Sequence, residues 1–214
     1  MFAIRRIEIR GADPRTEAAV RQALRPIEGK NLLALGGGDV ARLADSLPYV
    51  VSVRYSRWFP HTLRVTVVEE RAVAVLHRGN DRFLVSARAR VIRPLAPNAF
   101  PSLPRIWVPR STDVGLGATL AGDPGAAVVP LVPLQRLQFP LRVATAQAAG
   151  GQLTLRLVTG LELRLGDAQD LPLKLAIARQ IAPTITPSAG AYLDLSVPER
   201  PVAGVKNSKV AGRG

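Results

Sequence analysis

Residues 47–71 read LPYVVSVRYSRWFPHTLRVTVVEER, and this stretch decides the fold of the N-terminal part of the chain. Apolar and polar residues alternate over Val51–Tyr55 and again over Leu63–Val67, as they do in strands with one buried face. Between the two runs lie Trp58–His61, which include a proline. The stretch therefore predicts an antiparallel hairpin with its turn at 58–61.

A strand and two helices are predicted before this hairpin. Ile4–Arg10 alternates isoleucine with charged residues, which is typical of a strand. Asp13 and Pro14 supply an N-cap and a proline at the first helical position. Asp39 is expected to cap a second helix, which ends before the hairpin. Residues 1–70 are thus predicted to fold as β-α-α-β-β, with two helices covering one face of a small sheet.

The rest of the chain is predicted to be mainly β. Residues 94–140 are rich in proline and glycine, and only an irregular helix over Ala126–Leu137 is expected there. Apolar residues recur with helical spacing over Leu171–Ile181, which predicts a regular helix. The predicted strands are Val73–Leu76, Arg82–Val85, Arg90–Arg93, Leu153–Leu157, Leu161–Leu165, Tyr192–Leu195 and Arg200–Val205.

These elements predict an α+β protein with two domains and a tail. A β-α-α-β-β domain is expected at 1–70, and a mainly antiparallel β domain with one or two helices is expected at 71–205. The tail at 206–214 is basic and contains few apolar residues, so it is predicted to be disordered.

The chain is strongly and unevenly basic. Its net charge is +13, and residues 71–214 hold 18 basic against 8 acidic residues. The arginine cluster at 71–93 includes a single acid, Asp81. Such a patch attracts polyanions, so a basic nucleic-acid-binding protein is one alternative. A solvated sheet face without a dedicated site is the simpler explanation of the cluster.

No residues form a pattern typical of catalysis or of cofactor binding. Cysteine is absent, and two histidines, His61 and His77, are too few for a histidine metal site. The glycines before Asp39 are not followed by the Lys-Ser/Thr of a phosphate loop, and Gly115–Gly117 has no preceding strand. We therefore expect no catalytic, cofactor-binding or metal-binding residues, and a protein that is not an enzyme.

Several short strings recur in the order and spacing of a known domain. They are Ile7–Gly11, Gly29–Leu32, Leu47–Val50, Arg57–Pro60 and Val65–Arg71. On these residues the chain resembles the POTRA domain of the FtsQ/DivIB bacterial cell-division family. Strings that match the family's second, β-rich domain are Gly151–Leu153, Leu161–Gly166, Lys174-Leu175 and Tyr192–Leu195. Leu84–Arg90 departs from the family, which usually has an acidic-glycine turn there.

The resemblance implies a non-enzymatic scaffold that acts outside the cytoplasmic membrane. Such a protein binds the partners FtsB and FtsL, contacts other divisome proteins, and links divisome assembly to septal wall synthesis. It lies in the cell membrane at the division septum, single-pass, with these residues on the extracytoplasmic side. Because family members carry a transmembrane helix directly before the POTRA domain, we expect an N-terminal anchor that is missing from this sequence. Neither a cofactor nor nucleic acid is implied.

The resemblance also implies a mode of binding at the end of the second domain. A sheet whose last strand is open presents unpaired N–H and C=O groups that can accept a strand from another chain. In the family, FtsB is received in this way. The residues expected to take part in this strand addition are Tyr192, Leu193, Leu195, Arg200, Val202, Ala203, Gly204 and Val205.

A POTRA-bearing outer-membrane assembly or secretion factor is a further alternative. Such proteins continue into a membrane barrel built from strands of about 10 residues. The sequence predicts too few strands of that kind, so the cell-division scaffold is the preferred interpretation.

Overall fold

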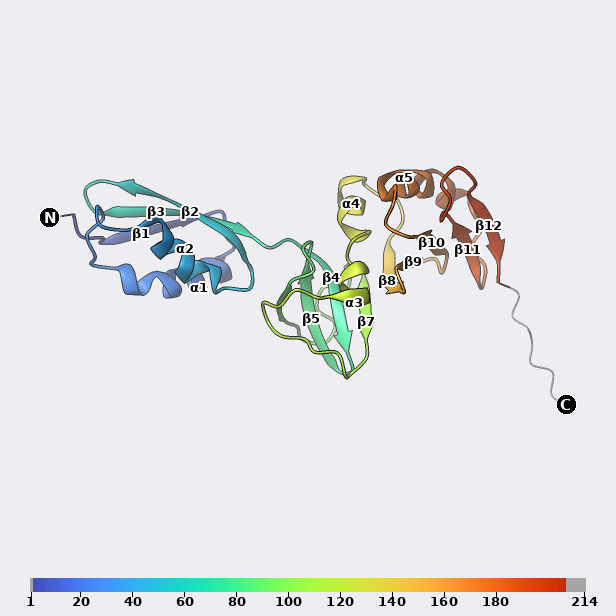
Figure 1. Cartoon of the computed structure of the whole chain (residues 1–214), viewed down its shortest axis with the longest axis horizontal. Coiled ribbons are helices and arrows are strands. Elements are labelled where there is room, and N and C mark those ends of the chain that lie inside the picture. The colour runs from blue at the N-terminus through green and yellow to red at the C-terminus, as the bar shows by residue number, and fades with distance from the viewer. Residues whose placement is uncertain (1, 207–214) are drawn as a thin grey trace. The chain divides into compact units, whose positions relative to one another are not determined.

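The computed structural model describes residues 2–206. These residues separate into two compact units that divide between Arg71 and Ala72 (Figure 1). Of the predicted tail at 206–214, only Lys206 lies within the described residues, and its ammonium group pairs with Glu162.

The N-terminal unit has the predicted β-α-α-β-β order. Its elements are β1 (Arg6–Arg10), α1 (Pro14–Leu24), a 3-10 turn at Arg25–Ile27, α2 (Gly37–Asp45), β2 (Val50–Trp58) and β3 (Thr62–Glu69). The sheet order is β1-β3-β2, with β2 antiparallel and β1 parallel to β3. The hairpin of residues 47–71 therefore supplies the central strand and one edge of this sheet.

One hydrophobic core lies between this sheet and its two helices. Leu63, Val65 and Val67 of β3 are buried and separated by single residues, so they point to the same face of the sheet. They belong to one cluster with buried residues of both helices, among them Val20 of α1 and Val40 of α2. The predicted arrangement of two helices on one face of a small sheet is confirmed.

The two helices begin in different ways. Asp13 caps α1 as predicted, because its carboxylate accepts a hydrogen bond from the Thr16 N–H at 2.8 Å. The prediction that Asp39 caps the second helix is wrong, because α2 already begins at Gly37. The Asp39 carboxylate instead reaches back and accepts a hydrogen bond from the Gly36 N–H at 3.0 Å, which satisfies a donor at the helix start.

The second unit is built on one nine-stranded sheet with the order β12-β11-β10-β9-β8-β7-β4-β5-β6. Five of the eight strand pairs are antiparallel, which confirms the mainly antiparallel β fold. The helices are α3 (Gly122–Ala126), α4 (Leu131–Arg136) and α5 (Leu171–Ile181), with a 3-10 turn at Ala182–Thr184. The strands are β4 (Ala72–Arg78), β5 (Asp81–Ser86), β6 (Val91–Pro94), β7 (Arg105–Val108), β8 (Val143–Ala149), β9 (Gln152–Leu157), β10 (Glu162–Gly166), β11 (Ala191–Asp194) and β12 (Val202–Val205).

The region between β6 and β9 differs most from the prediction. The sequence predicts neither β7, which has four residues after Pro104, nor β8, which reads VATAQAA. Alanine has a low strand propensity, so β8 gives a weak local signal. The irregular helix expected over 126–137 is shorter than predicted: α4 covers only Leu131–Arg136, and the separate α3 ends at Ala126. Pro130, at the N-cap of α4, lacks the N–H that a continuous helix requires.

The turn between β5 and β6 replaces the acidic-glycine turn that the resemblance implies. Ala89 adopts a left-handed conformation with φ of 57°, which glycine adopts more easily. The buried Ser86 hydroxyl accepts hydrogen bonds from the N–H groups of Arg88 and Arg90, both at 3.2 Å. β5 and β6 still pair antiparallel, so the unusual sequence leaves the hairpin intact.

A buried lysine attaches α5 to the sheet. The Lys174 side chain is 2% exposed, and its ammonium group contacts the Asp167 carboxylate at 2.9 Å and the Asp167 carbonyl at 3.1 Å. The hydrogen bond from Lys174 and another from the Gln169 N–H lower the pKa of Asp167. Since Asp167 directly follows β10, this contact fixes the start of α5 against the end of that strand.

The two partners of this contact are expected to respond differently to substitution. Lys174→Ala should lower the free energy of unfolding by about 2–5 kcal/mol, because it leaves a cavity under α5. Lys174→Met retains most of the packing and should destabilise less than Asp167→Ala, which leaves a buried ammonium group without its carboxylate. Urea unfolding followed by circular dichroism tests this order. A Lys174→Met variant less stable than Asp167→Ala would contradict it.

Candidate functional site

The nine-stranded sheet ends in a strand with one free side. β12 pairs antiparallel with β11 through Tyr192–Gly204 and Leu193–Ala203, and it is the last strand in the sheet order. Figure 1 shows it at the C-terminal end of the sheet. Within residues 2–206, no strand lies on its outer side, so this side presents a row of backbone N–H and C=O groups.

The pairing pattern identifies the groups that face outward. The Lys206 N–H donates to the Gly190 carbonyl at 2.9 Å, so this pair is hydrogen-bonded across the two strands. Residues in an antiparallel ladder alternate between facing the partner strand and facing away from it. Gly204 and Val202 therefore face β11, whereas the N–H and C=O groups of Ala203 and Val205 face outward.

The opposite edge of the sheet is covered by the chain itself. In β6, the Val91 N–H donates to the Ala118 carbonyl at 2.9 Å, and the Val91 carbonyl accepts from the Gly117 N–H at 2.8 Å. Val91 is fully buried, whereas Val202 and Val205 of β12 are 53% and 55% exposed. At the β12 edge, therefore, the outward backbone groups lack a neighbouring strand among the described residues, and the valine side chains are exposed to solvent.

A cluster of polar side chains holds β12 in place. The Arg164 guanidinium lies 3.8 Å from the centre of the Tyr192 ring, and its Nε donates to Glu162 at 2.9 Å. Lys206, next to β12, reaches the same carboxylate at 3.0 Å. Burial acts to raise the pKa of Glu162, but hydrogen bonds from Arg164 and Lys206 outweigh it and hold the pKa below its usual value. The contacts connect β10, β11 and the end of β12.

Gly204 is a point of close approach within this cluster. A Cβ atom at this position would lie 2.7 Å from the Tyr192 hydroxyl and 2.8 Å from the adjacent ring carbon. The phenol ring therefore lies against the β12 backbone at Gly204, where a larger residue would collide with it.

The structure narrows the set of residues predicted to receive a partner strand. Leu193 lies in β11 and Leu195 directly follows it. Both side chains are buried and β11 is paired on both sides, so neither residue lies at the open edge. Tyr192 also lies in β11 and can offer only its half-buried side chain. Arg200 is exposed but lies in a turn before β12, where its N–H donates to the Val197 carbonyl at 3.0 Å. The open edge itself comprises Val202, Ala203, Gly204 and Val205.

Sequence reasoning alone misses Glu162, Arg164 and Lys206. The alternation of Leu161–Leu165 indicates that Glu162 and Arg164 share a polar face, but not which strand lies next to them. Their neighbour is set by the parallel register of β10 with β11, which joins segments separated by α5.

Other candidates from the sequence have structural roles. The Asp39 carboxylate is used at the start of α2, so the glycine run before it offers no free anion site. His61 Nδ1 lies 3.1 Å from the Ala3 carbonyl, where it ties the N-terminal segment to the β2–β3 turn. Among the described residues there is no group of three side chains that could hold a metal ion. None of the helices in residues 2–206 is both long and apolar enough to span a bilayer.

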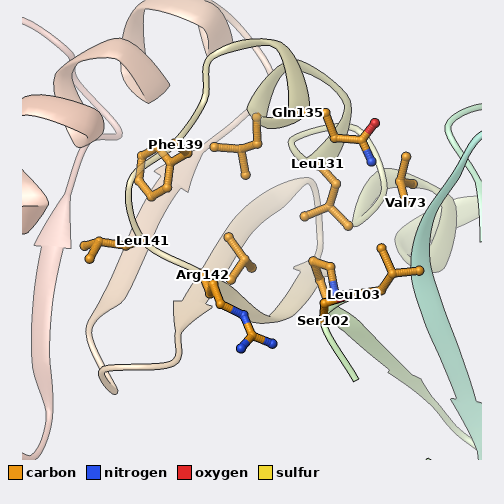
Figure 2. A pocket seen from close by; sticks show the side chains of 11 residues that line it. Val73, Ser102, Leu103, Leu131, Gln135, Phe139, Leu141 and Arg142 are labelled. Atoms are coloured by element: carbon orange, nitrogen blue, oxygen red, sulfur yellow. The ribbon is translucent and has the colours of Figure 1, made fainter. Parts of the chain in front are cut away.

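An apolar pocket of about 230 Å³ lies beside α4 (Figure 2). Leu131, Phe139 and Leu141 line it. Three polar side chains lie at the pocket, Ser102, Gln135 and Arg142, and the last two donate to backbone carbonyls at 3.3 and 3.2 Å. The lining is therefore mainly apolar, and we assign no ligand to this pocket.

Comparisons with known proteins agree with the fold. Residues 2–70 match the family described as POTRA domain, FtsQ-type. The cell division protein FtsQ of Rhizobium meliloti (strain 1021) is 31% identical over 117 residues, which are 55% of this chain and 38% of that protein. FtsQ of Agrobacterium fabrum (strain C58) is 28% identical over 56% of this chain and 38% of its own length. FtsQ of Rhizobium radiobacter is 29% identical over half of each protein. The matches confirm the resemblance to the FtsQ/DivIB family, although they span at most half the length of these relatives.

The Glu162 cluster is expected to make β12 sensitive to acid. A carboxyl group whose pKa is lowered by folding stabilises the folded state above its unfolded pKa, and this contribution is lost as the pH falls through the folded pKa. Hydrogen-exchange protection of the Gly204 amide should therefore decrease between about pH 5 and pH 3. Glu162→Gln should reduce the protection of this amide at neutral pH and should make the protection independent of pH in this range. Glu199→Gln should change neither the protection at neutral pH nor its dependence on pH. Equal pH profiles for all three proteins would contradict the role of Glu162.

Proposed function

Residues 2–70 form a POTRA domain of the FtsQ type, and from this premise we propose that the chain is a non-enzymatic cell-division scaffold acting outside the cytoplasmic membrane. Its partners would be the homologues of FtsB and FtsL, together with other divisome proteins. The names of the similar proteins support the cell-division role. In this proposal an N-terminal anchor holds the protein in the cell membrane at the septum, and the scaffold links divisome assembly to septal wall synthesis.

The open edge of β12 is the observation that carries the proposal. A strand from the FtsB homologue would lie beside β12 and pair with the outward N–H and C=O groups of Ala203 and Val205. Each ladder hydrogen bond contributes about 0.5–1.5 kcal/mol net, so a short strand needs side-chain contacts as well. The exposed Val202 and Val205 offer these contacts on opposite faces of the sheet.

The cluster behind β12 supports this mode of binding. A partner strand binds tightly only if the receiving strand is already ordered, because ordering it on binding would reduce the affinity. The contacts of Glu162 with Arg164 and Lys206 keep β12 against β11 before a partner arrives. We propose that β11 and the cluster act as support and that β12 makes the contact.

Proline substitutions on β12 test this proposal. Ala203→Pro removes an outward N–H that has no partner within residues 2–206, so it should weaken capture of the FtsB homologue by about tenfold or more with little change in melting temperature. Val205→Pro should act in the same way. Ala203→Ser keeps the N–H and should bind like the unaltered protein.

Val202→Pro provides a contrasting variant. It removes an inward N–H that faces β11, so it should destabilise β12 itself and reduce its hydrogen-exchange protection. Undiminished capture by both Ala203→Pro and Val205→Pro, measured by pull-down and calorimetry, would exclude strand addition at this edge.

A further inference from the structure

The arginines of the cluster at 71–93 have different hydrogen-bond and ion-pair partners in the structure. Arg78 pairs with Asp81 at 3.1 Å, and Arg90 Nε donates to the Gly117 carbonyl at 2.9 Å. Arg82 is different: it lies on β5 opposite His77 of β4, and it has no ion pair within residues 2–206. The cluster is therefore more than a uniformly solvated face, and Arg82 requires a separate explanation.

Strand register places a second arginine and a tryptophan on the same face. β4 lies between β5 and β7, so His77 pairs with Arg82 on one side and with Trp107 on the other. Two residues earlier on β4, Val75 pairs with Arg105 of β7. Directly paired residues, and residues two apart on a strand, point to the same face of a sheet. Arg82, His77, Arg105 and Trp107 therefore share one face.

A cavity of about 200 Å³ lies on this face. The loop after β6 contributes Asn98 and Phe100 to its lining. The Leu95 N–H donates to the Arg82 carbonyl at 2.8 Å, so the start of this loop is held against β5. The cavity thus lies between the loop after β6 and the face of the three paired strands β5, β4 and β7.

The lining of this cavity is positively charged. Arg82 and Arg105 are both half-buried, Arg105 likewise has no ion pair within the described residues, and no carboxylate lines the cavity. Burial lowers the pKa of His77, and the positive charges of Arg82 and Arg105 lower it further, so this imidazole is neutral at neutral pH. The cavity therefore offers two cationic donors to an incoming group.

Trp107 adds an apolar platform beside these charges. Its side chain is 62% exposed, yet its ring is held against the buried His77 ring with the two centroids 4.2 Å apart. A large aromatic side chain that is both exposed and held in position binds with a small loss of conformational entropy. Tryptophan and arginine are also the residues that contribute most often to the strongest contacts in protein interfaces.

We propose that this cavity is an anchor site for an acidic peptide segment of a partner protein. One glutamate or aspartate carboxylate enters between Arg82 and Arg105 and accepts hydrogen bonds from both guanidinium groups. An apolar side chain next to it in the peptide packs on Trp107.

The size of the cavity favours a single side chain. Sites for drug-sized ligands usually have volumes of about 300–1,000 Å³, which is more than this cavity offers. A chain of acidic sugars would need an extended groove, whereas one carboxylate-bearing side chain fits. This site is on β4, β5 and β7, several strands away from β12 in the sheet order, so it does not depend on the function proposed for that edge.

Trp107 can report on binding directly. The chain has two tryptophans, so Trp58→Phe leaves Trp107 as the only one. In this background, an acetylated and amidated Ser-Leu-Glu-Leu-Ser peptide should produce a saturable change in fluorescence. The same peptide with glutamine in place of glutamate should bind about tenfold more weakly, because it lacks the charge that both arginines recognise.

Charge-matched variants separate the site from general electrostatic attraction. Arg82→Gln combined with Arg105→Gln should weaken binding by about tenfold or more. Arg136→Gln combined with Arg179→Gln removes the same charge from two exposed helical positions and should change binding by less than about twofold. Circular dichroism should show the same fold for both, and capture of the FtsB homologue should be unchanged.

Three results would overturn the proposal. The first is equal weakening by the two double variants, and the second is equal binding of the glutamate and glutamine peptides. The third is a saturable response that depends on Arg82 and Arg105 with an oligogalacturonate but not with the peptide, which would assign the cavity to acidic sugars instead.

Discussion

The second unit depends on how its sheet satisfies the backbone groups at its two ends. An open sheet has two edge strands, and each edge carries N–H and C=O groups without partners. At β6 the N–H and C=O groups of Val91 bond to residues 117 and 118 of the same chain, and Val91 and Ile92 are buried. At β12 the chain makes no such cover within the described residues. The contrast between the edges indicates that the β12 edge is a specific feature of the fold.

An exposed edge must still be held in position by the rest of the protein. β12 has four residues, so its own ladder with β11 is short. Further contacts on the β10 and β11 side of the strand hold it in place. The Arg164 guanidinium stacks on the Tyr192 ring, and the Glu162 carboxylate accepts hydrogen bonds from Arg164 and Lys206. The parallel pairing of β10 with β11, which α5 connects, places these groups beside one another. The order of β12 therefore depends on contacts that are distant in sequence.

The elements that the sequence predicts correctly are those with a regular local pattern. The alternation in residues 47–71 reflects one buried face, so it is visible without knowledge of the neighbours. The apolar spacing in 171–181 indicates a helix correctly, but this helix buries Leu171, Lys174, Leu175 and Ala178 and leaves Leu173 exposed, which the spacing does not predict. β8 is missed because it is fixed by its pairing with β7 and β9 and by the burial of Ala146, which local propensity does not contain. The register between strands that are distant in sequence also lies outside local reasoning, so neither the Glu162 cluster nor the pairing of His77 with Trp107 could be predicted.

The few acids of the second unit are mostly engaged in contacts that leave some of its arginines without a counter-charge in the described part of the chain. Five of the eight carboxylates in residues 71–214 accept hydrogen bonds inside the unit, namely Asp81, Asp123, Glu162, Asp167 and Asp194. Each of them fixes a turn, a helix start or a strand. Because these acids serve the fold, Arg82 and Arg105 line their cavity without a counter-charge from residues 2–206. Their positive potential is therefore available to groups from outside the chain, and the strand register concentrates it at one cavity.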